Sequence, residues 1–401
     1  MRIGIVTETY PPEVNGVALT VAGLVHGIAE AGHEVQLIRP RQASDRDLDR
    51  VEWGIDSVLV RGIALPRYPG LQFGMPADGR LRKLWTKQRP DAIYVATEGP
   101  LGASALRAAK ALGIPASTGF HTRFDDFARH YRLGALAPLL MRYLRNFHRR
   151  GAATFVPTVE LVEFLSRRNF GNVVRLPRAV DTRLFAPARR DDSLRAEWGL
   201  APGDLAVLYV GRIAPEKNLP LAVGSYRAIQ ELVPNTRYVW VGDGPATAGL
   251  KAQNPDFIFA GVQRGQALAR HYASADLFVF PSLTETFGNV TLEALASGVP
   301  TLAFDYGAAR EYLRDGCGQR VAFGDADAFV QAARALAVAP RLGGAMRREA
   351  RAAVEGLDPA AVCASFVAAL ANLESAAAEQ RSAPATALLD ERTEAMVRRP
   401  S

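Results

Sequence analysis

Short apolar runs alternate with helical segments along the chain, and this alternation constrains the fold more than any other feature. In the first half the apolar runs are Ile3–Val6, Val35–Ile38, Ser57–Val60, Ala92–Val95, Ala116–Thr118 and Thr154–Val156, with helical patterns such as Ala18–Ala31 and Leu101–Leu112 between them. Continuous apolar runs of this length are typical of strands buried on both faces of a parallel sheet. The alternation therefore predicts an α/β fold with helices covering parallel sheets.

The alternation occurs twice. It stops in a polar, aperiodic stretch at residues 186–192 and restarts with apolar runs at Ala206–Val210, Arg237–Val241, Phe257–Phe259, Leu277–Phe280 and Thr301–Phe304. A chain of 401 residues is long enough for two such units. We expect two Rossmann-like domains facing each other across a cleft, at residues 1–185 and 186–375. Residues 376–401 are rich in Ala, Glu, Arg and Ser and are predicted to form a disordered tail.

Cysteine content and hydropathy indicate the compartment. The two cysteines, Cys317 and Cys363, provide no disulfide framework, which fits a reducing environment. The first residues reach Glu8 too early for a signal peptide. No run approaches the roughly 18 apolar residues of a membrane span. We therefore expect a cytoplasmic protein.

The most informative segment for function is Glu285–Glu293, which begins and ends with a carboxylate. The apolar run Leu277–Phe280 before it ends at Pro281, and a helical pattern follows from Val290. Such strand-to-helix loops form the ligand crevice at the carboxyl ends of parallel strands, where the first backbone amides of the helix bind anions. By itself the segment is equally compatible with a surface loop that carries a solvated Glu and an ordinary helical Glu.

In its context this segment resembles the Glu-x7-Glu motif of the retaining glycosyltransferases of family 4, which have the GT-B fold. The resemblance spans nearly the whole chain, through Met1–Gly16, Phe120–Thr122, Arg178–Phe185, Gly211–Asn218, Gly242–Pro245 and Ala275–Asp276. It implies an enzyme that transfers a hexose from a nucleotide-sugar, which is a substrate, so no cofactor is expected. It also implies that the last helix, Pro359–Leu373, crosses back to the first domain.

The resemblance and the chemistry of the leaving diphosphate together suggest catalytic residues. Arg212 and Lys217 follow the strand Val207–Val210, and two cations can stabilise a departing diphosphate. Glu285 would accept hydrogen bonds from sugar hydroxyls, and the resemblance gives it no role as a covalent nucleophile. His121 follows a short strand, and the resemblance implies that it orients the donor through its ring or its backbone carbonyl. The ordinary alternatives are surface cations and a structural histidine.

The remaining predicted donor contacts lie in loops after strands. Gly16 would allow close approach of the backbone to phosphate, although many relatives have two adjacent glycines where this chain has Asn15-Gly16. Glu293 would accept hydrogen bonds from the ribose hydroxyls. The full predicted donor-binding set is Gly16, Gly242, Val262, Phe287, Gly288, Asn289, Val290 and Glu293. Arg178 is predicted to support the domain junction rather than the reaction.

Metal binding is not expected. Asp-x-Asp spacing occurs at Asp45-Arg46-Asp47, Asp47-Leu48-Asp49 and Asp325-Ala326-Asp327. The first two lie in a polar loop, and Asp325 precedes a helical run as a helix N-cap does. The resemblance implies leaving-group stabilisation by cations and helix dipoles instead.

The identity of the donor and acceptor stays open. The loop Gly261–Gly265 contains no carboxylate to pair with guanine, which disfavours GDP and leaves UDP open. In contrast, Thr7–Val17 is similar to bacterial GDP-mannose-dependent lipid α-mannosyltransferases. Val262-Gln263 and Ala273–Asp276 are similar to sulfoquinovosyl-diacylglycerol synthases, which use a UDP-sugar. We expect a hexose of the mannose or glucose type and a membrane glycerolipid acceptor, giving an α-linked glycolipid.

Positive charge is concentrated in one stretch, Arg123–Arg150. It holds seven arginines against two aspartates, out of a formal net charge of +7, with aromatic and aliphatic residues interleaved. A basic amphipathic segment of this kind can lie on an anionic membrane, here the inner face, as a peripheral contact. A solvated face of a core helix is an equal alternative. No nucleic-acid partner is expected, because no recognised nucleic-acid-binding motif is present.

Three other functions remain open at this point. The enzyme could act on a soluble sugar or polysaccharide acceptor. The chain could be a non-catalytic sugar-nucleotide or membrane-binding protein on the same scaffold. A nucleotide-sugar epimerase shares the two-domain architecture but has no reason to match these motifs.

Overall fold

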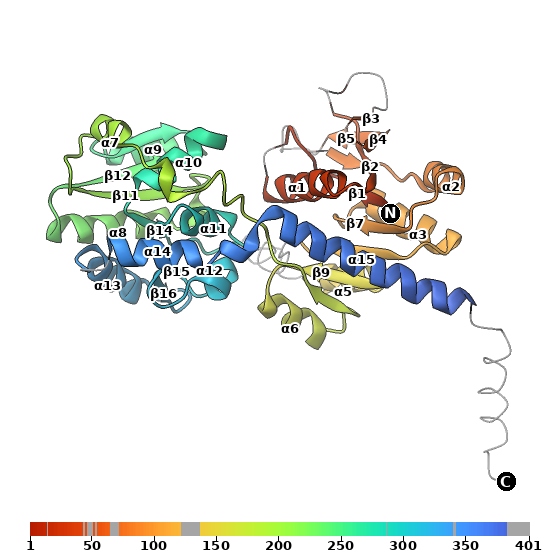
Figure 1. The fold of residues 1–401 in the computed structure, drawn as a ribbon. Coiled ribbons are helices and arrows are strands. Elements are labelled where there is room, and N and C mark those ends of the chain that lie inside the picture. Colours follow the sequence, from red (N-terminus) through yellow and green to blue (C-terminus); the bar gives the residue numbers. More distant parts are fainter. Residues whose placement is uncertain are drawn as a thin grey trace, which may run out of the picture.

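A computed structural model of the chain describes residues 1–13, 15–42, 45, 51–52, 54–64, 72–121, 137–285, 287–339 and 342–382. It consists of two lobes side by side, each built on a sheet flanked by helices (Figure 1). The predicted architecture of two Rossmann-like domains is confirmed. The predicted boundary between residues 185 and 186 falls between the last strand of the first sheet and the first strand of the second.

The N-terminal sheet has eight strands in the order β10-β9-β8-β7-β1-β2-β4-β3, all paired in parallel except β3 with β4. The strands are β1 Arg2–Val6, β2 Glu34–Pro40, β3 Val51–Glu52, β4 Ile55–Val60, β7 Ala92–Val95, β8 Ala116–Gly119, β9 Ala153–Val156 and β10 Val173–Arg175. The helices are α1 Gly16–Glu30, α2 Asp78–Lys87, α3 Pro100–Leu112, α5 Ala137–His148 and α6 Val159–Arg167, and a hairpin pairs β5 Gly62–Ala64 with β6 Gln72–Gly74.

Alternate residues of these strands pack on opposite faces of the sheet. Ile3 and Ile5 face the apolar cluster that includes α1, whereas Val6 and Ile93 face the cluster that includes α2 and α3. A parallel sheet buried on both faces needs apolar residues at every position. This explains why the predicted apolar runs coincide with the strands.

The C-terminal sheet has six strands in the order β13-β12-β11-β14-β15-β16. They are β11 Leu205–Val210, β12 Thr236–Val241, β13 Ile258–Gly261, β14 Leu277–Phe280, β15 Thr301–Phe304 and β16 Gly318–Val321. The helices are α7 Asp192–Glu197, α8 Leu219–Leu232, α9 Thr247–Gln253, α10 Gly265–Ser274, α11 Asn289–Ala296, α12 Gly307–Tyr312, α13 Ala326–Ala337 and α14 Gly344–Ala352, with short 3-10 turns η2 Pro187–Arg189, η3 Pro215–Lys217 and η4 Glu355–Leu357. The sequence analysis did not predict β16 or the short strands β3, β5 and β6.

The predicted linker at residues 186–192 is folded rather than irregular. It contains η2, and the Asp191 carboxylate caps α7 by accepting hydrogen bonds from the backbone N–H groups of Ser193 and Leu194. The stretch is polar because it supplies this cap. Hydropathy alone does not distinguish such a polar capping segment from a loop.

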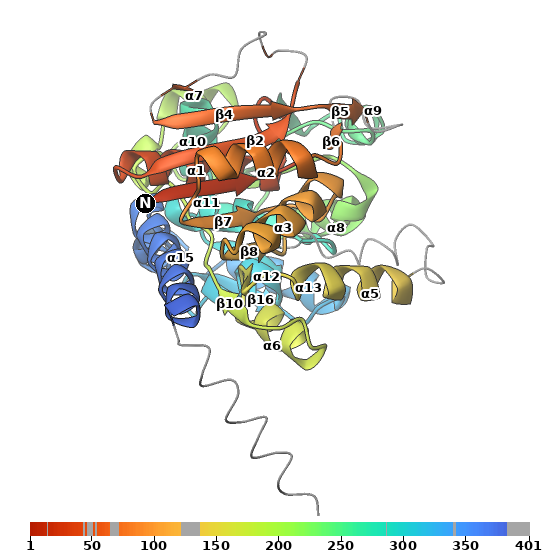
Figure 2. The same cartoon turned by 90° about the vertical axis from the view of Figure 1, so that its right-hand side faces the viewer.

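The last helix, α15 Pro359–Ser382, crosses back to the N-terminal domain, as predicted (Figures 1 and 2). Phe366 packs against Tyr94 and Phe155, and Cys363 lies against Gly27 of α1. The helix continues past residue 376, where the disordered tail was predicted to begin, and residues 383–401 lie outside the described part of the chain.

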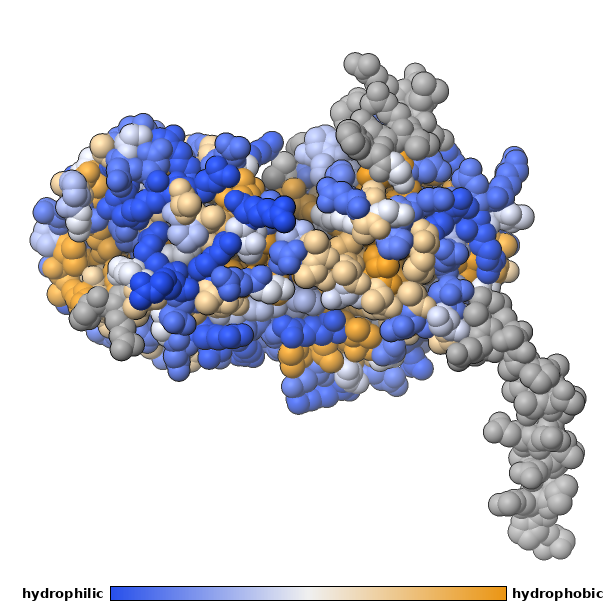
Figure 3. All heavy atoms as spheres, viewed as in Figure 1, coloured by the Kyte–Doolittle hydropathy of each residue, from blue (hydrophilic) through white to orange (hydrophobic). Residues whose placement is uncertain are grey.

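The prediction that no segment could span a membrane is wrong by the criterion of length and composition. Pro359–Ala376 of α15 meets that criterion, because its many alanines keep the mean hydropathy high. Figure 3 shows apolar side chains gathered where this helix crosses the N-terminal lobe. Phe366 and Leu370 of this helix are buried against the N-terminal domain, and Val362 is buried beside the space between the domains.

Two ion pairs join the domains on the side of α6 and α12. Arg175 contacts Glu311 at 2.8 Å, and Arg310 contacts Glu160 at 3.4 Å. Glu311 also accepts a 2.8 Å hydrogen bond from the backbone N–H of Val159, at the start of α6. These contacts and α15 hold the two sheets in one arrangement around the space between them.

Candidate active site

Lys217 and Glu285 meet at the carboxyl ends of the C-terminal strands. Lys217 ends η3 after β11, and Glu285 lies in the loop after β14. The Lys217 ammonium forms an ion pair with the Glu285 carboxylate and also donates to the carbonyl of Thr284 at 3.3 Å. Ser282 donates a 2.9 Å hydrogen bond to the same carboxylate. Two predicted catalytic residues are thus brought together across 68 positions of sequence.

Arg212 lies apart from this pair. Its side chain is 62% exposed and its nearest carboxylate is Glu216, at 3.7 Å. It stands on the loop that leads to Lys217, at the surface of the C-terminal domain. Its predicted role in holding phosphate is compatible with this position, because an exposed guanidinium on a short loop can turn toward a ligand.

The segment Phe287–Val290 forms the turn that starts α11. Gly288 is the N-cap, with φ of 94°, a left-handed conformation that glycine adopts readily. The buried Phe287 is fixed by its carbonyl, which accepts a 2.7 Å hydrogen bond from Ala308. Because the first backbone N–H groups of a helix have no intrahelical acceptor, those at the start of α11 are available for an anion.

Glu293 lies one turn into α11 and is held by Tyr272 of α10. The Tyr272 hydroxyl donates a 2.9 Å hydrogen bond to one carboxylate oxygen of Glu293. Burial raises the pKa of the Glu293 carboxyl to about 7, and the hydrogen bond from Tyr272 opposes this rise only in part. Glu293 is therefore a carboxylate that titrates near neutral pH.

His121 lies opposite, at the carboxyl end of β8, and both of its ring nitrogens are occupied. Arg178 approaches Nδ1 at 2.7 Å, and the Tyr94 hydroxyl approaches Nε2 at 2.7 Å. Because a guanidinium only donates, Nδ1 accepts, and the ring proton is on Nε2 and is donated to Tyr94. Burial, aided by Arg178, holds the pKa of His121 well below its usual range. The ring is neutral and fixed, which favours the backbone of His121 as the group that contacts a donor.

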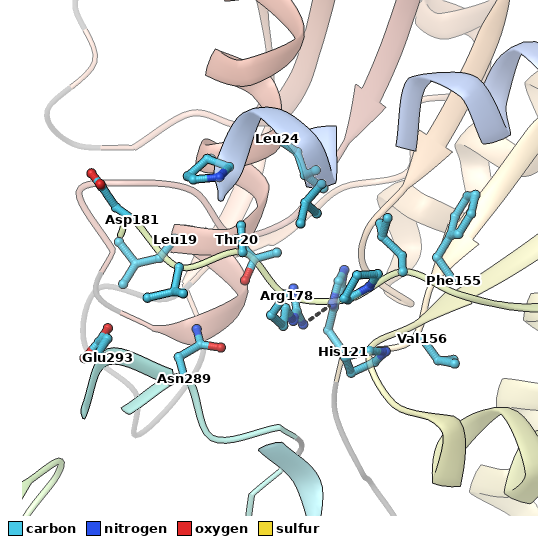
Figure 4. Close-up of a pocket in the computed structure, with 18 of the residues that line it drawn as sticks. Leu19, Thr20, Leu24, His121, Phe155, Val156, Arg178, Asp181, Asn289 and Glu293 are labelled. Carbon is cyan, nitrogen blue, oxygen red and sulfur yellow. Dashed lines mark hydrogen bonds between the residues drawn. The ribbon is translucent and has the colours of Figure 1, made fainter. Parts of the chain in front are cut away.

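A cavity of about 300 Å³ joins the two halves of the site. It is lined by His121 and Arg178 on one side and by Asn289 and Glu293 on the other, with Thr20 of α1 between them (Figure 4). His121 of the N-terminal domain and Asn289 and Glu293 of the C-terminal domain therefore face one interdomain pocket, as a site that assembles two substrates requires. The predicted catalytic residues Arg212, Lys217 and Glu285 are not among the residues that line it.

The other predicted donor residues differ in their surroundings. Gly16 begins α1, and a Cβ added there would meet no atom within 4 Å, so space is open beside it. Position 242 requires glycine for structural reasons, because a Cβ added there would lie 2.0 Å from the carbonyl oxygen of Gly211. Val262 follows β13 and is 57% exposed, at the rim of the C-terminal domain.

Two aromatic residues of the site were missed by the sequence analysis. Tyr94 lies in the apolar strand β7 and Tyr272 in α10, and both are fully buried. The available signal was their hydroxyl groups, because a buried tyrosine requires a hydrogen-bond partner. The sequence does not reveal that these partners are His121 and Glu293.

Acidic side chains do not gather as a metal site. Within the part of the chain that the structure describes, no group of three or more His, Cys, Asp and Glu side chains is arranged to hold a metal. Asp325 is the N-cap of α13, as predicted, and accepts a 2.9 Å hydrogen bond from Ala328. Asp47 and Asp49, of the other Asp-x-Asp pairs, lie outside the described residues.

Comparisons with known proteins agree with this geometry. A family model described as Glycosyltransferase Family 4 matches residues 14–184, and one described as Glycosyl transferases group 1 matches residues 204–338. A GDP-mannose-dependent alpha-mannosyltransferase of Mycolicibacterium smegmatis is 35% identical over 315 residues, which cover 78% of this chain and 82% of that protein. An alpha-monoglucosyldiacylglycerol synthase of Streptococcus pneumoniae is 28% identical over 76% of this chain and 71% of its own length.

Among solved structures, a sucrose-phosphate synthase from Thermosynechococcus elongatus superposes with a TM-score of 0.74 at 18% identity, covering 94% of this chain and 99% of that chain. This likeness concerns the fold, which is the GT-B arrangement. With the sequence matches to both halves and the residues that face the interdomain pocket, it leads to one conclusion: the chain belongs to glycosyltransferase family 4 and is a hexosyltransferase that uses a nucleotide-sugar.

Proposed function

We propose that the enzyme transfers mannose from GDP-mannose to the head group of a membrane glycerolipid, with retention of the anomeric configuration. The observation that carries this proposal is the interdomain pocket in which His121 faces Asn289 and Glu293. The ion pair of Lys217 with Glu285, at the carboxyl ends of the C-terminal strands, supports it. The 35% identity to a protein named as a GDP-mannose-dependent alpha-mannosyltransferase supports the choice of donor.

Each group has a task in this reaction. Lys217 and Arg212 would stabilise the negative charge that develops on the leaving diphosphate, together with the first amides of α11. Glu285 would hold sugar hydroxyls, and Glu293 would accept hydrogen bonds from the ribose diol. His121 would fix the sugar from the N-terminal side. Gly16 would leave room for the diphosphate at the start of α1.

Donor choice can be tested by thermal unfolding and transfer assays with GDP-mannose, UDP-glucose and ADP-glucose. Ligand at about 100 times its dissociation constant adds roughly 2.7 kcal/mol to the folded state. We expect a clear rise of the transition with GDP-mannose and an α-mannosylated glycerolipid as product. A rise with UDP-glucose alone would replace mannose by glucose in the proposal, and no transfer from any of the three would contradict it.

The acceptor proposal rests on α5, the described part of the basic stretch, and residues 123–136 lie outside the described part of the chain. Its inner face packs on the domain through Leu144 and Phe147. Its outer face exposes Leu139 and Tyr143, with 66% and 45% of their surface accessible, and Arg142. Arg149 and Arg150 are exposed in the turn that follows the helix. Apolar and cationic side chains on one exposed face fit an anionic lipid surface. We therefore propose that the enzyme acts at the cytoplasmic face of a membrane.

Replacing Arg142, Arg145 and Arg149 by Gln should weaken binding to vesicles that contain anionic lipid by roughly 10²-fold, because each charge near the surface contributes about 1 kcal/mol. Co-sedimentation with the vesicles measures this. A matched control replaces the exposed Arg82, Lys83 and Lys87 of α2, which removes the same charge from a helix without exposed large apolar residues. Equal loss in both variants would point to net charge alone and reject α5 as the contact.

Donor binding should depend on pH through Glu293. Since burial raises its pKa to about 7, the carboxylate is largely protonated at pH 6 and ionised at pH 8. Only the ionised form accepts two hydrogen bonds from the ribose diol, so the Kd for GDP-mannose should be roughly tenfold weaker at pH 6 than at pH 8. Calorimetric titration measures this, and the diphosphate diester of the ligand does not itself titrate in this range.

The raised pKa of Glu293 also makes the free energy of unfolding depend on pH. The folded protein binds this proton more tightly than the unfolded chain, so the contribution of Glu293 falls as pH rises from about 4.5 to 7. Glu293→Gln should flatten the pH profile of donor binding and should remove the contribution of Glu293 from the pH profile of stability. Glu8, whose carboxyl pKa burial also raises to about 7, does not line the pocket, so Glu8→Gln should leave the binding profile unchanged. A binding profile that disappears only in Glu8→Gln would reject the role of Glu293.

A further inference from the structure

Arg178 is a buried cation whose surroundings differ from those of other buried arginines. It lies between β10 and the C-terminal domain, lines the interdomain pocket, and is 8% exposed. Arg195, which is similarly buried, pairs with Asp276 at 2.8 Å, and Arg39 pairs with Asp45 at 2.7 Å. Among the described residues, no carboxylate forms an ion pair with Arg178.

The contacts of Arg178 with the other described residues leave part of its guanidinium unsatisfied. One terminal nitrogen donates to His121 Nδ1 at 2.7 Å, a neutral acceptor. Nε is buried and has no hydrogen-bond partner. Burial lowers the pKa of Arg178 to about 10, and among the described residues Tyr94 opposes this shift. A guanidinium withdrawn from water without a counter-charge is strongly unfavourable, so the folded protein bears a cost at this position.

The pocket beside Arg178 can accept a ligand that would remove this cost. Figure 4 shows Arg178 next to His121, with Thr20 and Asn289 across the open space. The amide of Asn289 can donate hydrogen bonds to such a ligand. The hydroxyl of Thr20 already donates to the carbonyl of Gly16 at 2.7 Å. The carboxylates of Asp181 and Glu293 line the far part of the same pocket, and neither forms an ion pair with Arg178.

We propose that Arg178 forms an anion-binding subsite in the interdomain pocket, which holds a phosphate or carboxylate group of a substrate. The inference rests on the proposed function for the identity of that substrate. Two sources supply the required chemistry: the diphosphate of the donor and an acidic head group on the acceptor lipid. Planar, charge-assisted recognition of such groups is what a guanidinium provides and an ammonium does not.

The test compares wild type with Arg178→Gln in direct binding assays that need no turnover. The probes are inorganic pyrophosphate, dioctanoyl phosphatidic acid and neutral dioctanoylglycerol. If the anion is the diphosphate, the variant should bind pyrophosphate at least tenfold more weakly. If it belongs to the acceptor, pyrophosphate binding should stay unchanged, while the preference for phosphatidic acid over dioctanoylglycerol should fall at least tenfold.

Arg183→Gln is the matched control, because Arg183 is an exposed arginine five positions further along the same connection. Unchanged binding of both anionic probes in Arg178→Gln would overturn the proposal. Arg178→Lys provides a second variant that keeps the charge. If both variants unfold without ligand, the guanidinium is structural and the proposal is wrong. Failure of wild type to transfer any sugar would reject the proposed function but would leave these binding results interpretable.

Discussion

Replacing Lys217 by alanine is expected to lower the rate of sugar transfer by roughly 10²–10³-fold, the usual effect of removing one preorganised group that stabilises transition-state charge. Lys217 is held by Glu285 and by the carbonyl of Thr284, so its ammonium is already fixed when the diphosphate begins to leave. The substitution also leaves the Glu285 carboxylate with Ser282 as its remaining side-chain partner. Steady-state kinetics with saturating donor measures the change in kcat.

The control is Lys251→Ala, which removes an exposed lysine from α9 in the same domain. It should retain the kcat of wild type. A Lys217→Ala variant that keeps a normal kcat and loses only donor affinity would show that Lys217 binds the ground state and does not act on the leaving group. Normal kcat and normal KM together would remove Lys217 from the site.

The fold was largely predictable from sequence because parallel strands are buried on both faces. Runs such as Leu277–Phe280 and Thr301–Phe304 are apolar at every position and coincide with β14 and β15. The edge strand β16, Gly318–Val321, was missed because its middle residues Gln319 and Arg320 are exposed. A strand with one neighbour has no need of an apolar run, and the signal disappears with the burial.

The sequence predicted which site residues lie together only where those residues are close to one another along the chain. Glu285 and Glu293 share one loop and helix, so their spacing predicts a common crevice. The partners that set their charge come from other elements: Lys217 from η3 and Tyr272 from α10. Arg178 was assigned to the domain junction, where it does lie. The sequence could not reveal that the Arg178 guanidinium is buried without an ion pair to a carboxylate of the described residues. That property depends on the tertiary arrangement of side chains that are distant in sequence.

Gly242→Ala is expected to destabilise the C-terminal domain strongly. Gly242 has φ of 133°, and a Cβ there would lie 2.0 Å from the carbonyl oxygen of Gly211. The atom in conflict is backbone, at the point where β11 and β12 end, and it cannot rotate away as a side chain would. Gly211 and Gly242 each donate a backbone hydrogen bond, to Val241 and Gly261, and relief of the clash would break these. The strained conformation and the overpacking together should cost about 3 kcal/mol or more.

Thermal unfolding followed by circular dichroism measures this cost, which should lower the transition by roughly 5–10 °C for a domain of this size. Gly224→Ala is the matched control, because Gly224 lies in the exposed interior of α8 and a Cβ there meets no atom within 4 Å. Alanine should stabilise that helix by about 0.5–1 kcal/mol. The two substitutions add the same methyl group to the same domain, and opposite signs are expected. A Gly242→Ala protein as stable as wild type would show that the ends of β11 and β12 can separate, and the loop from Gly211 to Lys217 would then lack the fixed position that its role at the diphosphate requires.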